Sequence, residues 1–459
     1  MDHHHDGNRR AQDPLRVAGS GSLGLVTDLY QLTMASSYLA RGLTQPATFS
    51  LFVRHLPPNR SFLVASGIDD AVDLLESFAF DDAALDWLST QGFDAAAIDA
   101  LGRLRFSGDV WAVPEGRVVF PNEPLIEVTA PLPEAQIVEA LVLNQVTYQT
   151  ALATKAARCT LAAAGRADLV DFSLRRTHGI EAGMAAARAA AIAGFVGTSN
   201  MGAARRFGLR SVGTMAHSYV TAFPDEYEAF TAFAEDFPDR ATFVVDTYDT
   251  LKGVDVAIDV IDRLQLRGRL GVRLDSGDLL DLSVLARRRL DEACHHDVAI
   301  VASGGLDEFE IKRLLDAGAP IDVFGVGTKV GVAADAPSLD SAYKLVEFND
   351  RPLMKQSSGK ATMPGPKQVH RLAPSRDVLA TRSERPPPDS TPVLTPVMVG
   401  GARRVASATV GQGHERLLQD LAWLSPELKV LKGEQVSPVT VSEELEALTR
   451  TVQADIHQR

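Results

Sequence analysis

The chain has 459 residues, of which 45% are hydrophobic and 23% are charged, with a formal net charge of −13. This composition is typical of a globular protein with enough apolar side chain for one large core or two smaller ones. A surface this acidic repels nucleic acids and anionic membranes, so neither is expected as a partner. No stretch reaches the roughly 18 uninterrupted apolar residues of a membrane helix.

The cysteine content indicates a reducing compartment. Only Cys159 and Cys294 are present, and they are far apart in the sequence. Two scattered cysteines form neither a disulfide framework nor a metal-ligand spacing, so we expect a cytoplasmic protein. Residues 1–22 are polar, lack the apolar core of a secretion signal and are expected to form a disordered tail.

The front of the chain, residues 23–135, shows a mixed helix and strand pattern. The helical period predicts a short helix around Tyr30 and further helices between residues 69 and 104. A long helix is expected from about Glu134 to Ala164. Alternating apolar residues predict strands at Phe49–Val53, Asp109–Ala112 and Arg117–Phe120.

The middle of the chain, residues 136–345, is the most regular part. Short apolar runs end in small or polar residues and mostly alternate with helical stretches, which predicts parallel βα units. Seven such units predict a barrel or near-barrel, with its chemistry at the carboxyl ends of the strands. The runs are Ala167–Ser173, Gly194–Ser199, Ser211–His217, Ala241–Tyr248, Leu270–Ser276, Val298–Gly305 and Ile321–Thr328.

Two glycine clusters end consecutive predicted strands. They are Ser303-Gly304-Gly305 and Gly325-Val-Gly327-Thr328. Glycines let backbone N–H groups approach an anion closely, and the helix that follows adds its positive amino end. The pair predicts a phosphate site, while two tight turns without a ligand would give the same pattern.

The segment Arg273-Leu-Asp275-Ser-Gly-Asp278 places one cation and two carboxylates within six residues. Alternation along a strand puts Arg273 and Asp275 on one side, facing the mouth. Such carboxylates can hold a Mg²⁺ that bridges phosphates, or bind ribose hydroxyls, while Arg273 holds an anion. The alternative is an ordinary turn with a capping aspartate.

Two other strand ends carry candidate groups. Phe172 precedes Arg175 and Arg176, and together they suit a planar ring that carries negative charge. His217 ends another strand, and imidazole can act as a nucleophile that carries a covalent intermediate. Taken singly, a core phenylalanine, solvated arginines and a structural histidine are the commoner explanations.

The regular pattern breaks after Val330, and residues 346–459 form a separate pattern. A strand is predicted at Tyr343–Phe348, and a basic loop with Lys355 and Lys360 follows it. Helices are predicted near Glu415–Leu424 and Glu443–Ile456.

Seven motifs occur in order along the chain: Thr27-Asp-Leu-Tyr-Gln-Leu-Thr-Met34, Phe52-Val-Arg54-His-Leu-Pro, Asp171-Phe-Ser-Leu-Arg-Arg-Thr-His178-Gly179, Gly213-Thr-Met-Ala-His217-Ser218, Arg273-Leu-Asp-Ser-Gly-Asp278, Ser303-Gly-Gly-Leu-Asp307 and Phe324-Gly-Val-Gly-Thr328. Together they resemble the nicotinate phosphoribosyltransferase family. The resemblance implies an irregular, incomplete α/β barrel plus an α/β domain built from the front and back of the chain, the back adding a helical extension. It also implies a homodimer with shared active sites.

The resemblance further implies roles for single residues. Phe172 would stack on the pyridine ring of nicotinate, opposite the partner subunit's Tyr30. Arg273 would hold the carboxylate, Asp275 would contact ribose, and Thr198 and Ser199 would contact substrate. The remaining implied contacts are Arg54, Arg175, Lys355 and Lys360 for pyrophosphate and phosphate, and Ser303, Gly304, Gly305, Gly327 and Thr328 for the 5′-phosphate.

The implied reaction joins nicotinate to phosphoribosyl pyrophosphate with consumption of ATP. It yields nicotinate mononucleotide and pyrophosphate, the first step of NAD synthesis from nicotinate. His217 matches the histidine that ATP phosphorylates in this family. Asp275 and Asp278 are the expected contacts of a Mg²⁺ ion carried by pyrophosphate. Catalysis would rest on positioning and on neutralisation of the leaving group.

Two positions bear on the choice of substrate. Nicotinamide-using relatives have an aspartate at the position of Ser199, and an aspartate there would repel a carboxylate. Ser199 therefore favours nicotinate. Many relatives have glycine at the position of Ser173, so the backbone would approach the ring or phosphates differently here.

Several alternatives stay open at this stage. One is a phosphoribosyltransferase for nicotinamide or quinolinate, and another is a catalytically silent sensor of nicotinate or its mononucleotide. The sensor is disfavoured because His217, Asp275 and Asp278 are retained. An unrelated sugar-phosphate barrel enzyme would leave the motifs around Tyr30 and Arg54 without a role.

Overall fold

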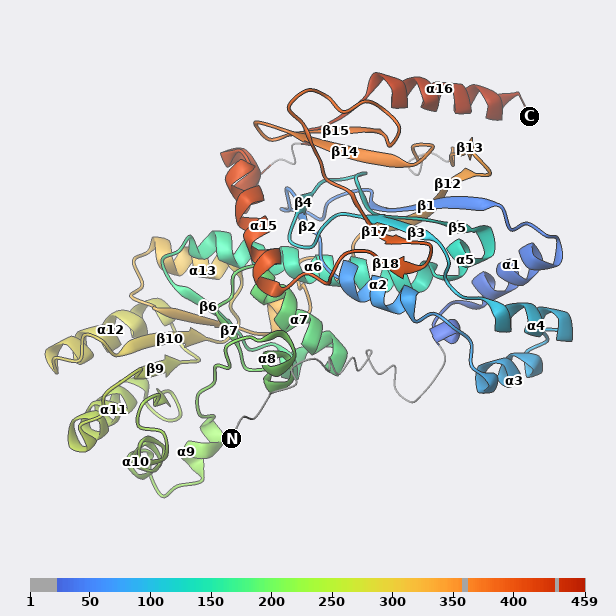
Figure 1. Ribbon diagram of the computed structural model, residues 1–459. Coiled ribbons are helices and arrows are strands. Elements are labelled where there is room, and N and C mark those ends of the chain that lie inside the picture. Colours follow the sequence, from blue (N-terminus) through green and yellow to red (C-terminus); the bar gives the residue numbers. More distant parts are fainter. Residues whose placement is uncertain (1–22, 357–361, 434–436, 459) are drawn as a thin grey trace, which may run out of the picture.

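The computed structural model describes residues 23–356, 362–433 and 437–458 (Figure 1). The predicted tail and Lys360 lie outside these residues. Two large sheets sit side by side, and the long helix α6 (Glu139–Ala163) runs between them. No helix in the described ranges is long and apolar enough to cross a membrane.

The first sheet joins the front of the chain to its back. Its seven strands lie in the order β13-β12-β1-β5-β3-β17-β18. The front contributes β1 (Pro46–Val53), β3 (Asp109–Ala112) and β5 (Pro124–Pro131), and the back contributes β12 (Ser341–Phe348), β13 (Arg351–Pro352), β17 (Thr395–Val399) and β18 (Ala402–Arg403). The mixed origin of this sheet confirms the α/β domain that the resemblance implied.

Strand β1 is the best buried strand of this sheet. Residues 47–53 are all buried, although alternation predicted burial of one face only. The reason is that both faces of the sheet are covered: α5 (Leu132–Ile137) contacts β1 on one side, and a second sheet contacts β5 on the other. Buried Glu127 of β5 joins the two sheets, since its Oε1 lies 3.2 Å from Lys367 Nζ.

The covering sheet was not predicted. It has the order β16-β14-β15-β19, with β14 (Lys367–Leu372), β15 (Arg376–Thr381), β16 (Thr391–Pro392) and β19 (Val439–Val441). A short pair, β2 (Leu63–Val64) and β4 (Val118–Val119), completes the strands. The helices of this half are α1 (Leu29–Ala40), α2 (Ile68–Glu76), α3 (Asp82–Thr90), α4 (Ala95–Arg103), α15 (Val410–Trp423) and α16 (Glu443–His457).

The second large sheet is parallel and forms an incomplete barrel. Its order is β7-β6-β11-β10-β9-β8, with β6 (Asp168–Asp171), β7 (Gly197–Thr198), β8 (Thr242–Val244), β9 (Gly271–Leu274), β10 (Ala299–Ser303) and β11 (Val323–Val326). Six of the seven predicted runs therefore form strands. The run Ser211–His217 makes only an isolated bridge, from Ser211 to Thr198, so the sheet stays open between β7 and β8.

Helices lie between the strands of this sheet in the chain and directly after the last one. They are α7 (Ile180–Ile192), α8 (Met201–Phe207), α9 (His217–Thr221), α10 (Glu226–Asp236), α11 (Thr250–Leu264), α12 (Leu279–Glu292), α13 (Glu308–Asp316) and α14 (Thr328–Gly331). The single long helix predicted from Glu134 to Ala164 is instead two, because Val138 ends α5 and begins α6 with a ψ of 0°.

A buried ionic network fixes α6 to its neighbours. Glu308, at the start of α13, has no exposed surface and accepts from Lys155 and from Arg158 Nε (2.9 Å). Lys155 Nζ also lies 3.1 Å from Asp335 Oδ1, and Arg60 Nε lies 2.8 Å from Asp335 Oδ2. Removal of one partner from such a network leaves a charge without compensation inside the protein.

We expect Glu308→Gln to destabilise the protein by about 3 kcal/mol. Lys155 would keep only Asp335, which also pairs with Arg60, and Arg158 would have no carboxylate partner among the described residues. Glu310→Gln is the matched control. Glu310 is on the same helix but pairs with the half-exposed Arg313, so its loss should cost less than about 1 kcal/mol. Urea or thermal unfolding of the full chain measures both, and equal effects would contradict the importance of the network.

Candidate functional site

The polar residues after the parallel strands meet at one edge of the open barrel (Figure 1). All six strands run in the same direction, so their carboxyl ends share that edge. Arg273, near the end of β9, is the centre of the arrangement, and its side chain is only 10% exposed.

The Arg273 guanidinium is held from several sides. Nε donates to the Ser303 hydroxyl (2.9 Å), and Nη2 lies 3.1 Å from Asp275 Oδ1. Nη1 donates to the Thr214 hydroxyl (2.7 Å) and to the Met215 carbonyl (3.2 Å). A guanidinium has five N–H groups, so one N–H of Nη2 is left for a ligand. Met215 accepts from Arg273 instead of pairing in a strand, which explains the missing seventh strand.

Asp275 is placed to accept from a bound hydroxyl. Burial opposes ionisation of its carboxyl, but hydrogen bonds from Ser303 and Arg273 hold its pKa below the usual value. Both of these contacts use Oδ1, and within the described residues no hydrogen bond reaches Oδ2. The result is an ionised carboxylate with one oxygen facing the mouth.

His217 is the first residue of α9 and pairs with Asp246. Its Nε2 lies 3.1 Å from Asp246 Oδ1, and the histidine side chain is 40% exposed whereas the aspartate is 2% exposed. Asp246 Oδ2 accepts from the backbone N–H of Asp275 (3.2 Å) and from the Ser276 hydroxyl. A carboxylate fixed in this way accepts the Nε2 proton, which leaves the Nδ1 lone pair of His217 free to react.

Asp246 is the functional residue to which sequence analysis gave no role. It follows β8 in a polar cluster at a predicted strand end, which was the available signal. Only the fold shows that this carboxylate lies against His217, 29 residues earlier in the chain.

The two glycine clusters form adjacent turns. Gly304 has a φ of +91°, and a Cβ there would lie 2.2 Å from the Asp275 carbonyl oxygen. Gly305 has a φ of +66° and is open to solvent. Within the described residues, neither glycine donates a backbone hydrogen bond. Asp307 then caps α13 and accepts from Lys329 at 2.7 Å, which ties this turn to α14.

Phe172 lies beside these turns because β6 pairs with β11. Its N–H donates to the Val326 carbonyl (2.8 Å), and its ring covers Gly325, where a Cβ would lie 2.5 Å from the ring. The half-buried ring is therefore fixed on the side of Gly325. Gly325 is needed for this packing, and Gly327 lies close to the Phe172 carbonyl.

Asp171 organises the residues next to Phe172. Burial raises the pKa of its carboxyl, against hydrogen bonds from Ser173 and Thr198. The Thr198 hydroxyl donates to Asp171 at 2.6 Å and is buried, so it positions the turn. The N–H of half-buried Ser199 donates to the Asp171 carbonyl at 2.8 Å.

Ser173 fits where relatives were expected to have glycine. Its φ is −85°, so the backbone does not require glycine. Its side chain is buried against Gly331, where a Cβ would lie 2.6 Å from that of Ser173. The serine is therefore accommodated by a glycine on α14.

Other predicted site residues are not joined to this cluster by their own contacts. Arg54 follows β1 and pairs with Asp340 at 3.0 Å. Arg175 is exposed in the turn after Phe172, and Lys355 is exposed after β13, with its backbone paired to Thr362. Tyr30 lies on α1, at the far end of the molecule from β9 and β10 (Figure 1). Burial and nearby Glu139 raise the pKa of Tyr30 to about 12, so it is neutral.

The carboxylates do not form a dedicated metal cage. Among the described residues, no group of three His, Cys, Asp or Glu could hold a metal ion. Asp278 caps α12 through the N–H of Leu280 at 3.0 Å, which supports the capping interpretation. Asp275 Oδ2 alone fits a single contact to a Mg²⁺ ion that arrives with phosphate ligands, as such ions usually do.

Glu226, at the start of α10, is a nearly buried acid near the His217 pair. Its Oε1 has no hydrogen-bond partner within the described part of the chain. Burial, together with Asp246 and Asp249, raises the pKa of its carboxyl to about 7. The fold therefore keeps a proton on Glu226 well above the pH at which a free glutamate loses it.

Comparison with known families gives two matches along the chain. Residues 25–147 match the nicotinate phosphoribosyltransferase (NAPRTase) N-terminal domain, and residues 167–372 match the nicotinate phosphoribosyltransferase (NAPRTase) family. The chain is 47% identical over 429 residues to nicotinate phosphoribosyltransferase pncB2 of Mycobacterium tuberculosis, covering 92% of each chain. It is 44% identical over 364 residues to a Bacillus subtilis nicotinate phosphoribosyltransferase, covering 76% of this chain and 73% of the other.

Solved structures agree with the sequence matches. The human nicotinic acid phosphoribosyltransferase superposes with a TM-score of 0.83 at 28% identity, covering 93% of this chain and 100% of the other. A nicotinate-nucleotide pyrophosphorylase from Pyrococcus furiosus gives a TM-score of 0.73 at 25% identity, covering 87% and 95%.

We expect Glu226→Gln to change how stability depends on pH. The folded carboxyl ionises at about pH 7 and the unfolded one near 4.5. Proton binding therefore stabilises the folded state fully below pH 4.5, and this contribution is lost as the pH rises through 7. Glutamine stays neutral, so the variant should gain roughly 1 kcal/mol over the parent between pH 5 and pH 8, after allowance for solvent screening. Thermal unfolding at both pH values measures this, with the exposed Glu228→Gln as control. Parallel pH profiles would contradict it.

Proposed function

Because this chain belongs to the nicotinate phosphoribosyltransferase family, we propose that the residues around Arg273 bind nicotinate and phosphoribosyl pyrophosphate and join them. The enzyme transfers a glycosyl group in NAD biosynthesis. The observation that carries the site assignment is a set of groups without a partner among the described residues: one Arg273 N–H, Asp275 Oδ2 and the Gly304 and Gly305 amides. The half-buried Phe172 ring lies beside them.

Each of these groups matches one part of the substrates. The ring of Phe172 accepts the pyridine ring, and the remaining N–H of Arg273 meets its carboxylate. Asp275 Oδ2 accepts from a ribose hydroxyl. The 5′-phosphate lies against the unpaired amides of Gly304 and Gly305, with Gly327 and Thr328 at the amino end of α14 beside them.

The pyrophosphate group needs positive charge at the outer side of the mouth. We assign this to Arg54 and exposed Arg175, with Lys355 and Lys360 from the basic loop. A bound Mg²⁺ would neutralise the phosphate oxygens, and Asp275 would supply its one contact to the chain, since Asp278 caps α12. The chain itself supplies orientation. The fixed Phe172 ring, the Arg273 guanidinium and the rigid glycine turns place the ring nitrogen opposite the anomeric carbon. The C–O bond to pyrophosphate then breaks as the C–N bond forms.

ATP acts through His217 in this proposal. The Nδ1 lone pair attacks the γ-phosphorus, the bond to the ADP oxygen breaks, and an N–P bond forms. Water later cleaves that bond and releases phosphate. Asp246 supports the step because it holds Nε2–H and offsets the positive charge on the phosphorylated imidazole. Its contact with the Asp275 N–H links this pair to the ribose site.

Tyr30 supports a shared active site between two copies of the chain. It lies on α1, far from its own barrel mouth (Figure 1), so its predicted place over the pyridine requires the partner subunit. We therefore propose a homodimer, and retain the boundaries 23–135, 136–345 and 346–459 for the parts of the chain. Cys159 and Cys294 are free thiols, in keeping with the proposed cytoplasmic location.

The first test is formation of mononucleotide from nicotinate, phosphoribosyl pyrophosphate and Mg²⁺, with and without ATP. We expect product from nicotinate, more of it with ATP, and none from nicotinamide, because Ser199 offers no carboxylate to the amide. Chromatography of the products measures all arms. Product from nicotinamide would contradict the role of Ser199, and no product under any condition would favour the silent sensor.

We expect His217→Ala to fold and to lose the ATP response, while turnover without ATP continues. Asp246→Asn should lower the response about 100-fold, since the imidazole would lose its fixed tautomer. Incubation with γ-labelled ATP followed by alkaline gel analysis measures the phosphohistidine. Label on the His217→Ala chain, or an unchanged ATP response, would rule out this histidine as the acceptor.

Mixed dimers test the shared site. A heterodimer of one Tyr30→Ala chain and one His217→Ala chain contains one site with both changes and one intact site. Refolding an equal mixture should therefore recover about a quarter of the ATP-stimulated activity that each variant lacks alone. No recovery, with heterodimers present by native mass spectrometry, would place Tyr30 outside the partner's site.

A further inference from the structure

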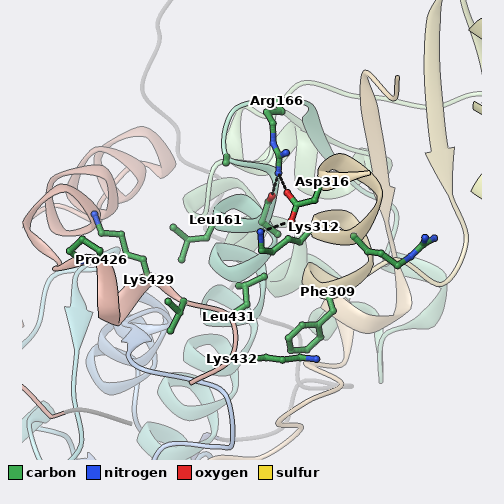
Figure 2. A pocket seen from close by; sticks show the side chains of 13 residues that line it. Leu161, Arg166, Phe309, Lys312, Asp316, Pro426, Lys429, Leu431 and Lys432 are labelled. Atoms are coloured by element: carbon green, nitrogen blue, oxygen red, sulfur yellow. Dashed lines mark hydrogen bonds and ion pairs between the residues drawn. The ribbon is translucent and has the colours of Figure 1, made fainter. Parts of the chain in front are cut away.

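A second pocket lies where α6, α13 and residues 426–432 meet (Figure 2). It is formed by the last turn of α6, one face of α13 and the segment 426–432, which begins with a 3₁₀ helix, η3 (Pro426–Lys429). Its volume of about 780 Å³ is in the range of small-molecule sites. None of its lining residues belongs to the proposed active site.

The pocket is positively charged in a negatively charged protein. Five of its thirteen lining residues are lysine or arginine and one is aspartate, while the chain carries a net charge of −13. Asp316 is already shared by Arg166 (3.1 Å) and Lys312 (2.6 Å). Arg313 is paired with Glu310, which lies outside the lining (2.7 Å). These two acids leave the five cations of the pocket with excess positive charge.

Two lysines of the segment 426–432, Lys429 and Lys432, line the pocket. Lys429 and Lys432 have no carboxylate partner within the described residues, and both are on the segment that faces α13 (Figure 2). Lys432 Nζ lies 4.8 Å from the centre of the Phe309 ring. Leu161 and Leu431 extend the apolar surface beside that ring. A flat apolar group can lie beside Phe309 and Leu431 while an acidic group reaches Lys432.

The pocket shares a helix with the phosphate-binding turn. Phe309 follows Glu308, the buried carboxylate at the start of α13. Arg158 connects both sides, since its Nε donates to Glu308 (2.9 Å), its Nη2 donates to the Leu431 carbonyl (2.9 Å), and its guanidinium lies 5.6 Å from the Phe309 ring. A ligand that moves Phe309 or Leu431 thus acts on the helix that begins three residues after Gly305.

We propose that this pocket binds a small organic anion with a flat apolar body, and that α13 transmits its occupancy to the phosphate-binding turn. The positive charge of the pocket and its Phe309 ring determine this class of ligand. The binding claim does not depend on the proposed function, because it is measured without catalysis.

Anilinonaphthalene sulfonate is a suitable probe, since it has one anionic group on a flat apolar body and fluoresces when shielded from water. We expect saturable binding to the full chain, and binding about tenfold weaker in the double variant Lys429→Glu, Lys432→Glu, which reverses both free charges. The matched control is Arg267→Glu, Arg269→Glu. It makes the same charge change at two exposed residues before β9 that have no side-chain partner within the described ranges, and it should bind as the parent does.

Equal binding by both double variants and the parent would overturn the proposal, because the probe would then lie elsewhere.

Competition with phosphoribosyl pyrophosphate and Mg²⁺ shows whether the probe binds in the active site or in the pocket. A probe in the active site is displaced progressively as this substrate is added, which would also overturn the proposal, whereas a separate linked site gives a limited change. The KM for phosphoribosyl pyrophosphate should shift with probe in the parent and not in the pocket variant. An unchanged KM in the parent would refute transmission through α13.

Discussion

One buried carboxylate holds the two halves of this enzyme together. Glu308 begins α13 and is fully buried, and it receives two cations from the middle of α6, Lys155 and Arg158. Since α6 runs between the two large sheets, this contact fixes the barrel to the rest of the molecule. Arg158 extends the contact to the carbonyls of Asn59 and Leu431, from the front and back of the chain. Desolvation of three charges is expensive, and only their mutual arrangement offsets it.

The same contact sets the position of the turn at residues 303–307, for which we propose phosphate binding. That turn ends in Asp307, the cap of α13, directly before Glu308. A turn that must present amides to a phosphate gains catalytic value from rigidity, because donors placed in advance need no reorganisation when the substrate binds. A helix anchored at its first residue supplies that rigidity. In our proposal the same helix transmits the effect of a ligand bound on its outer face to the turn.

The opening in the barrel is part of the site. A seventh strand would pair the Met215 carbonyl in the sheet, but here this carbonyl accepts from Arg273, as does the Thr214 hydroxyl. The arginine is thereby fixed with one N–H left over, and His217 begins a helix instead of ending a strand. The segment from Ser211 to His217 therefore forms only an isolated bridge, and it places the His217 imidazole beside Asp246.

The sequence by itself determined the alternation of strands and helices between residues 167 and 328 and the residues at the strand ends. These depend on local periodicity and on residue type, both of which are present in a short window. The family follows from the same ordered motifs. Three features could not be predicted from local periodicity: the break at Val138, the burial of both faces of β1, and the sheet that contains β14 and β15. Each depends on which distant segments pack against the element.

Tertiary structure alone decided which polar groups have partners. It joined His217 to Asp246, used four of the five Arg273 donors within the protein, and assigned Asp278 to a helix cap. It also joined Glu308 to α6, 150 residues earlier, and placed Lys432 over the Phe309 ring. Sequence spacing determines which groups are available at a strand end, whereas the packing of distant segments determines which of them remain free to bind a substrate.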